Sequence, residues 1–264
     1  MKVKDVMTKE VIYVSKGDDL YHVLTLMEKH NITKLPVLDD GKIAGIVTDN
    51  QIAEKLGSFR SKGVPASRMH ATTVMEKDFE RVSPDTEIKE ILRSVGEPGP
   101  TMLPVVVDDA LVGVVTKADL LPLVKSEESI EKIMKENVIT VKPEDRIIHA
   151  RRLMMENDVA RLPVVEEGKV VGIISDKEIA FALASIKKSF PMGKQQNQLR
   201  NLLVKDVMKS NVVTAKRDIS IKEAAQIMME EEVGCTPIVD DDGKIEGIVT
   251  RTDLLHHLRE EMGS

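Results

Sequence analysis

A short sequence pattern that occurs four times constrains this chain more than any other feature. Each copy reads glycine, two aliphatic residues, a hydroxyl residue, two variable residues and then an acid or, once, glutamine. The four copies occupy residues 45–51, 113–119, 172–178 and 247–253. Self-similarity of this kind is typical of repeat architectures, in which each repeat is one supersecondary unit.

The repeat extends upstream of this pattern with a constant spacing. A methionine opens each copy and a proline follows 29 positions later, as from Met7 to Pro36. The proline precedes the glycine by 9 positions in three copies and by 10 in the fourth, where the extra residue falls in a turn-forming run at 240–243. The opening methionines are Met7, Met75, Met134 and Met208. Four copies in register predict four equivalent units.

The residues of the first unit predict the order strand, helix, strand, strand, helix. Residues 11–14 form a short apolar run, and apolar residues over 20–27 fall at helical spacing. A strand over 35–38 begins with proline, where a missing N–H costs least. A turn, a strand over 43–47 and a helix over 49–56 complete the unit. The predicted fold class is therefore α/β (α+β).

Changes in composition predict where the repeats begin and end. We expect repeats over 1–58, 71–124, 128–186 and 202–264, joined by basic and polar linkers over 59–70 and 187–201. A unit of about sixty residues has a marginal core when it stands alone. The repeats should therefore pair and bury their apolar faces together.

The composition argues against several classes of function. Aromatic residues make up only 2% of the 264 residues, and the formal charge is −6, so neither base stacking nor a basic field favours nucleic-acid binding. A single cysteine, Cys235, is typical of a cytoplasmic protein. We expect no signal peptide and no membrane span, because no run of about 18 apolar residues occurs.

The motifs resemble a known family. The opening Asp5-Val6-Met7, strands such as Leu162-Pro163-Val164-Val165, and the endings built on glycine, hydroxyl and acid resemble cystathionine β-synthase (CBS) domains. The resemblance covers nearly the whole chain except the linkers. It implies antiparallel pairs of domains, called Bateman modules, forming a flat disc. Four domains in one chain resemble the γ subunit of AMP-activated protein kinase and its stand-alone archaeal relatives. The family binds AMP, ADP, ATP or S-adenosylmethionine between paired domains.

The repeated ending also suggests a binding chemistry from its residues alone. A carboxylate three residues after a hydroxyl, at a strand-to-helix junction, can accept the hydroxyls of a ribose. The hydroxyl residue lies where backbone N–H groups favour a phosphate. The expected ribose-binding residues are Asp119, Asp253, Glu178 and Gln51, and the expected phosphate-binding hydroxyls are Thr116, Thr250, Ser175 and Thr48. Gln51 should bind ribose most weakly, because an amide lacks the charge that strengthens hydrogen bonds.

The family resemblance adds further candidate residues. The position two residues before the strand proline is basic in the first and third repeats, as Lys34 and Arg161, and we expect both to contact phosphate. We hypothesise that the even repeat of a pair holds the ribose and the odd repeat the phosphate. The residues expected to contact adenine are Ile12, Ile139 and Val213, with Glu80 at that position in the second repeat.

Plainer interpretations compete with each of these. A threonine followed by an acid also fits a helix N-cap without any ligand. The methionines fit core packing, and Cys235 fits a buried small residue. The histidines show no zinc spacing, so we expect no metal site, and we expect His256 and His257 to be exposed.

The sequence therefore predicts a regulatory protein that binds AMP, ADP or ATP, senses energy state, and signals by a conformational shift to an unidentified protein. We expect no enzyme activity and no catalytic cofactor, because no residues outside the repeats remain to host them. One alternative is a sensor of S-adenosylmethionine or a related metabolite. Another is a structural scaffold with vestigial sites. A homodimer through the disc faces would be consistent with either.

Overall fold

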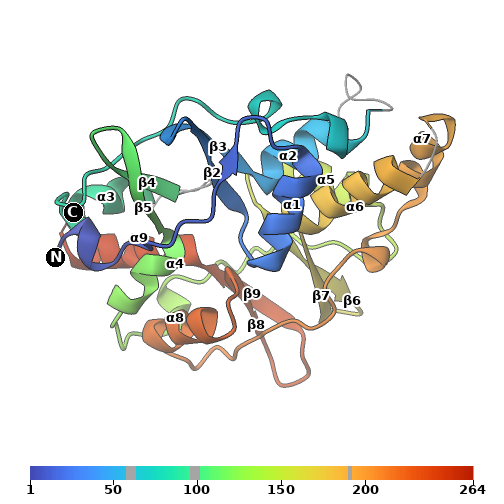
Figure 1. Cartoon of the computed structure of the whole chain (residues 1–264). Helices are drawn as coiled ribbons and strands as arrows, with labels where there is room; N and C mark the ends of the chain where they lie inside the picture. Colours follow the sequence, from blue (N-terminus) through green and yellow to red (C-terminus); the bar gives the residue numbers. More distant parts are fainter. Residues whose placement is uncertain (58–63, 96–101, 190–191, 264) are drawn as a thin grey trace.

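The computed structural model describes residues 1–57, 64–95, 102–189 and 192–263 (Figure 1). The first repeat contains the elements β1 (Val14–Ser15), α1 (Leu20–Lys29), β2 (Lys34–Asp39), β3 (Lys42–Thr48) and α2 (Asp49–Gly57). This order confirms the predicted one. The first strand is shorter than the predicted run over 11–14, because only Val14 and Ser15 pair with β2.

The other repeats follow the same plan. In each of them the first strand is reduced to a single parallel bridge onto the next strand, such as Val141 to Val164. The second repeat contains α3 (Ile88–Val95), β4 (Met102–Val107), β5 (Ala110–Thr116) and α4 (Lys117–Leu120). The third contains α5 (Ile147–Glu156), β6 (Arg161–Glu166), β7 (Lys169–Ser175) and α6 (Asp176–Ser189). The fourth contains α8 (Ile221–Glu230), β8 (Cys235–Val239), β9 (Ile245–Thr250) and α9 (Arg251–Glu261).

The segment predicted as a linker over 187–201 is largely helical. Helix α6 continues to Ser189, and α7 (Met192–Asn201) follows. Glutamine, lysine, leucine and arginine are good helix formers, so a polar composition was compatible with a helix. The first residues of the other predicted linker lie outside the described ranges, and its later part contains the short turn η3 (Ala66–Arg68).

The segment that opens each repeat packs on the neighbouring repeat rather than on its own. We call these the crossing segments, residues 1–8, 70–76, 129–135 and 203–209. Thr8 and Val114 exchange two backbone hydrogen bonds of 2.9 and 3.0 Å. The same exchange joins Glu76 to Ile46, Lys135 to Ile248, and Lys209 to Ile173. The first and second repeats therefore form one module and the third and fourth form another.

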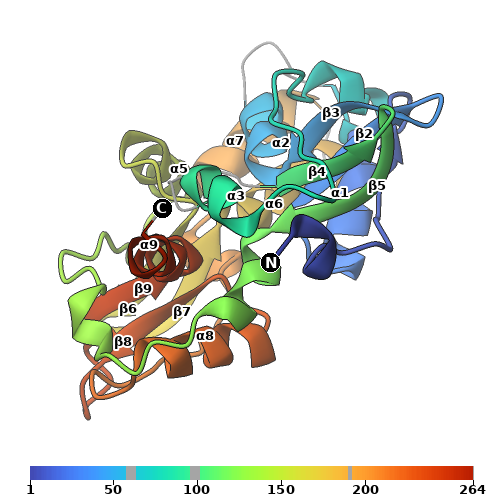
Figure 2. The ribbon, with the colours of Figure 1, turned by 90° about the vertical axis from the view of Figure 1, so that its left-hand side faces the viewer.

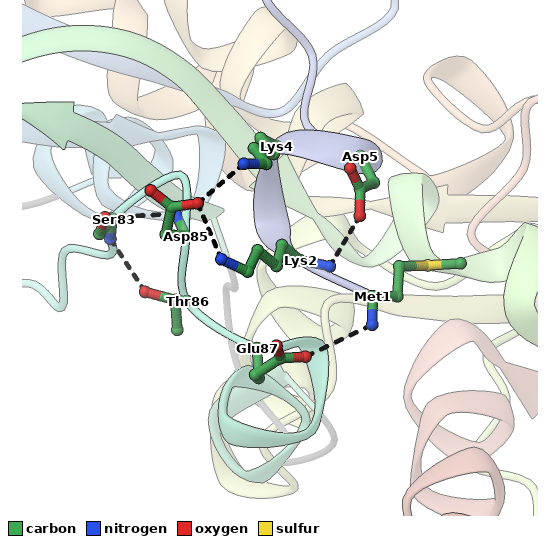
Figure 3. Close-up of polar contacts among 8 residues, drawn as sticks. All are labelled: Met1, Lys2, Lys4, Asp5, Ser83, Asp85, Thr86 and Glu87. Carbon is green, nitrogen blue, oxygen red and sulfur yellow. Dashed lines mark hydrogen bonds and ion pairs between the residues drawn. The ribbon is translucent and has the colours of Figure 1, made fainter.

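Charged side chains add to the attachment of the first crossing segment (Figure 3). The ammonium groups of Lys2 and Lys4 lie 3.0 and 2.8 Å from one carboxylate oxygen of Asp85, in the loop before α3. Hydrogen bonds from both lysines lower the pKa of Asp85 to about 2. An equivalent pair joins Lys205 to Glu144 at 2.8 Å in the second module. The crossing of segments is thus built alike in both modules.

The crossing explains why each repeat needs both its methionine and its glycine. A Cβ atom placed on Gly45 would lie 2.7 Å from the carbonyl oxygen of Glu76 and 2.9 Å from the sulfur of Met75. A Cβ on Gly113 would lie 2.8 Å from the sulfur of Met7. Because real Cβ atoms do not approach other atoms this closely, the glycine makes room for the neighbour's methionine.

The two modules are joined through helices and close into a ring. Strands β2 to β5 lie together in one half of the molecule and β6 to β9 in the other (Figure 2). One hydrophobic core combines the first and third repeats, and a second core combines the second and fourth. Figure 1 shows α1, α2, α5 and α6 gathered on one side and α3, α4, α8 and α9 on the other. Each repeat therefore contacts one neighbour through crossing segments and another through helices.

Adding a methyl group at Gly45 tests the crossing directly. Gly45→Ala is expected to lower the free energy of unfolding by about 1–3 kcal/mol, because the obstructing atom is a backbone oxygen that cannot rotate away. Gly17→Ala is the matched control, since nothing lies within 4 Å of a Cβ at that position. It should change stability by about 0.5 kcal/mol or less. Urea unfolding measures both, and equal effects would contradict the packing described here.

Candidate functional site

The hydroxyl residue of each repeated ending forms a helix cap with the acid three positions later or, in the first repeat, with Gln51. The backbone N–H of Thr116 donates to Oδ2 of Asp119 at 2.7 Å, and the Thr116 hydroxyl donates to the same oxygen. The same backbone bond joins Thr250 to Asp253 at 2.8 Å, Ser175 to Glu178 at 3.0 Å and Thr48 to Gln51 at 2.9 Å. The plainer interpretation of these pairs is therefore realised in all four repeats. Only one oxygen of each acid is used in this way.

The second oxygen of each acid faces the crossing segment of the partner repeat. Oδ1 of Asp119 accepts a hydrogen bond of 2.8 Å from the hydroxyl of Thr8. Oδ1 of Asp253 lies 2.9 Å from the ammonium of Lys135. In the third repeat, Oε1 of Glu178 lies 3.6 Å from the ammonium of Lys209. Thr8, Lys135 and Lys209 each come directly after a crossing methionine, so the acids lie at the contact between paired repeats.

Basic side chains from all four repeats lie within electrostatic reach of one another. The pKa of Lys34, at the start of β2, is lowered to about 7, chiefly because its ammonium is buried. Positive charges from the three other repeats also lower it, and these are Lys117, Arg161 and Arg251. The pKa of Arg251 is lowered to about 10, chiefly by burial and secondly by the positive charge of Arg161. The negative charge of Asp119 opposes that shift. We call these four residues the basic cluster.

The last helix of the first repeat begins with an acid, Asp49, and so does that of the third repeat, with Asp176. In the even repeats the corresponding residues are the bases Lys117 and Arg251. Burial raises the pKa of Asp49 and raises that of Asp176 to about 6, although the ion pair with Arg151 opposes the second shift. Arg151 also donates a 2.7 Å hydrogen bond to the side-chain oxygen of Asn50, in the first repeat. Arg151 therefore ties the third repeat to the first beside the basic cluster.

The candidate residues predicted from sequence fall into two groups. Lys34 and Arg161 lie in the basic cluster, and Arg251 brings the cluster within reach of Asp119. The residues predicted to contact adenine are partly buried next to the short first strands, and these are Ile12, Ile139 and Val213. Ile12 and Ile139 pack against the core that the first and third repeats share, whereas Glu80 is exposed.

The sequence interpretation missed Lys117, Arg251 and Arg151. The first two directly follow the hydroxyl residue of the repeated ending, where the odd repeats carry Asp49 and Asp176. Comparison of the repeats at this one position would have shown acids in odd repeats and bases in even ones. Arg151 lies on α5 with no repeated counterpart among these motifs, so only the structure shows its role.

Glycine makes room for a basic side chain as well. The guanidinium of Arg161 occupies the space that a Cβ on Gly234 would need, so this arginine passes over the backbone of the fourth repeat. Its neighbour Cys235 is buried, as predicted, and burial raises the pKa of the thiol. Arg161 thus reaches from the third repeat into the contact with its module partner.

Two of the histidines contact residues outside the basic cluster. His70, in the second crossing segment, places its Nδ1 atom 2.8 Å from the carbonyl oxygen of Gly17. The predicted exposure of the His256–His257 pair is wrong for His257, which is 8% exposed. Helix α9 turns this ring inward, and its Nε2 atom lies 3.1 Å from the hydroxyl of Ser126.

Comparison with known proteins identifies the family. The CBS domain family matches residues 3–58, 71–126, 130–185 and 204–260, and the chain therefore belongs to this family. Across the part of the chain that the structure describes, no helix combines the length and apolar character that a membrane crossing requires.

One similar protein matches over its full length. MJ1225 of Methanocaldococcus jannaschii is 27% identical over 274 residues, which cover 97% of this chain and 98% of that protein. Its crystal structure, described as that of a candidate archaeal homologue of γ-AMPK, has a TM-score of 0.84 with 26% identity and covers 98% of this chain. This similarity confirms the predicted architecture of four CBS repeats.

One further similarity is limited to the fold, and another covers only half of the chain. An uncharacterised conserved protein from Pyrococcus horikoshii has a TM-score of 0.60 at 20% identity and covers 98% of this chain, which shows a shared fold. Inosine-5′-monophosphate dehydrogenase of M. jannaschii is 34% identical over 133 residues, covering 50% of this chain but only 24% of that enzyme.

Arg151 should contribute strongly to stability. Its side chain is 13% exposed and that of Asp176 is 5% exposed, so Arg151→Met leaves a buried carboxylate without its partner. We expect a loss of about 3 kcal/mol in the free energy of unfolding, measured by urea titration at pH 7. Arg152→Met is the matched control on the same helix, because that side chain is 64% exposed. Its effect should stay below about 0.5 kcal/mol, and a similar loss in both variants would disprove the role of Arg151.

Proposed function

We propose that this protein is a regulatory binding protein for adenine nucleotides and has no catalytic activity of its own. The observation that supports this most is the basic cluster, to which each of the four repeats contributes one side chain. Like charges this close to one another repel, and Asp49 offsets part of that repulsion at Lys34. An anion bound among them, such as the phosphate groups of a nucleotide, would relieve that repulsion.

The acids beside the cluster supply the second half of the proposed site. Asp119 lies close enough to Arg251 for each charge to act on the other. In our proposal the ribose hydroxyls bind Oδ1 of Asp119 or Asp253, the oxygen outside the helix cap, and the phosphates extend toward the basic cluster. Glu178 would serve a third cleft, and Gln51 the weakest one, since its amide carries no charge. The hydroxyls Thr48, Thr116, Ser175 and Thr250 would lie near the phosphates as well as capping the helices.

The odd and even repeats would have different tasks in this arrangement. Lys34 and Arg161, which come from odd repeats, would bind phosphate, while Asp119 and Asp253, which come from even repeats, would bind ribose. The aliphatic residues Ile12, Ile139 and Val213 would contact adenine. A ligand that connects repeats in this way favours one relative arrangement of them, and a partner protein could detect that arrangement. The signal would be the cell's energy state.

A first experiment measures the ligands directly. Isothermal titration with AMP, ADP, ATP and S-adenosylmethionine should show saturable binding of the nucleotides to the wild-type protein. The double variant Asp119→Asn, Asp253→Asn keeps oxygen atoms for the helix caps but removes the charge. Its nucleotide affinity should fall about tenfold or more.

The control for that experiment uses a cap outside the site. Glu223 forms the same kind of cap with Ser220 at the start of α8, at 2.7 Å, and it is exposed. Glu223→Gln should leave nucleotide binding unchanged. If none of the four ligands binds to the wild type, the pairs are caps only and the scaffold interpretation replaces this proposal. Preferential binding of S-adenosylmethionine would replace it with the metabolite sensor.

A second experiment uses the titration of Lys34. Its pKa of about 7 means that this ammonium is only partly protonated at pH 7.5 in the free protein. A bound phosphate raises the pKa, so AMP binding should take up a fraction of a proton at pH 7.5, and affinity should fall as the pH rises from about 7 to 9. Calorimetry in buffers of different ionisation enthalpy measures the uptake.

The variant Lys34→Met isolates this effect. It places in the first repeat the residue that the second repeat carries at Met102. The variant should bind AMP more weakly, bind adenosine as well as the wild type does, and take up fewer protons with AMP. Unchanged proton uptake would show that Lys34 does not meet the phosphate.

A further inference from the structure

In the second module, the ammonium groups of Lys135 and Lys209 lie next to the carboxylate oxygens that a ribose would need. Lys135 pairs with Asp253 and Lys209 pairs with Glu178. Asp253 illustrates the arrangement. Its Oδ2 accepts hydrogen bonds from the backbone N–H and the hydroxyl of Thr250, at 2.8 and 2.6 Å. Its Oδ1 lies 2.9 Å from Lys135, which comes from the partner repeat. Because the cap is part of the fold, the oxygen that a ligand can take is the one that Lys135 holds.

The exposure of the two partners shows which of them can leave. The side chain of Asp253 is 9% exposed, whereas that of Lys135 is 62% exposed. The Lys135 ammonium can therefore move into water at little cost to itself, while the Asp253 carboxylate stays at the contact and needs another partner, such as a ribose hydroxyl. Its backbone stays in place, because Lys135 and Ile248 exchange hydrogen bonds of 2.9 and 3.0 Å. The lysine is a displaceable group that remains tethered beside the acid.

The two modules differ at this position. In the first module the neutral hydroxyl of Thr8 contacts Oδ1 of Asp119 at 2.8 Å. In the second module the equivalent residues are both lysines, and Lys209 is 55% exposed and 3.6 Å from Glu178. In the second module, a charged lysine therefore contacts the acid that a ligand would need. In the first module, the uncharged hydroxyl of Thr8 contacts it.

We infer that Lys135, and more loosely Lys209, compete with the ligand for the acids of the second module and so determine its affinity. This inference rests on the proposed function. Each ligand that binds at Asp253 must break the ion pair between the third and fourth repeats. Binding in the second module thus removes a link between two repeats, whereas binding at Asp119 displaces a neutral hydroxyl.

Adenosine is the probe that tests this, because an uncharged ligand has no direct electrostatic response to salt. The Asp119→Asn background restricts strong binding to the second module. In that background Lys135→Thr, which installs the residue type of the first module, should tighten adenosine binding about two- to fivefold. Raising the salt from about 50 to about 500 mM should tighten binding when Lys135 is present and should do so less in Lys135→Thr, where only the looser pair of Lys209 and Glu178 remains.

The reciprocal exchange and a control complete the test. In an Asp253→Asn background, Thr8→Lys should weaken adenosine binding and make it improve with salt. Lys132→Thr removes an exposed lysine of the same crossing segment that pairs with Glu128, and it should change neither affinity nor salt response. If the affinity for adenosine changes neither with salt nor with these exchanges, the inference is overturned and the proposed function still stands. If neither adenosine nor AMP binds to the wild type, both fail together.

Discussion

The fold depends on the exchange of crossing segments between the two repeats of each module. A pair of backbone hydrogen bonds fixes each segment on its neighbour, and the methionine sulfur fits over a glycine that has no side chain to obstruct it. This contact places the residue after the methionine against the neighbour's capping acid. The core, the pairing of repeats and the surroundings of the candidate site all follow from one close approach of two backbones.

Charge distinguishes repeats that are otherwise alike. The residue after the capping hydroxyl is acidic in the odd repeats and basic in the even ones, while the residue at the strand start is basic only in the odd repeats. When the ring closes, Asp49 and Asp176 lie close enough for their charges to interact, and Arg151 forms an ion pair with Asp176. Among the bases, Arg251 lies within electrostatic reach of Asp119. A fourfold repeated backbone thereby acquires a centre in which the acids of the odd repeats lie within electrostatic reach of bases from the basic cluster.

Regular spacing made the repeats, their order of elements and the family predictable, because periodic apolar residues and turns are local properties. The crossing was not predictable, since the methionine and glycine that meet belong to different repeats. Either residue could equally have packed within its own repeat. The contacts of Thr8, Lys135 and Lys209 with the capping acids could not be predicted either, because they also join residues of different repeats. The polar run predicted to link the third and fourth repeats contains α7, which was not foreseen because composition alone does not separate a polar helix from a loop. The ligand roles of the capping acids remain predictions.

The exchange of opening segments also limits how such a chain can change in length. A single repeat cut from it would carry a segment made for its neighbour and would lack the one that completes its own core. A chain with three repeats would leave one groove empty, open to the segment of a second molecule and hence to swapped association. The unit that can be gained, lost or transplanted intact is therefore the pair, and a change at Gly113 is constrained by a methionine more than one hundred positions away, at Met7.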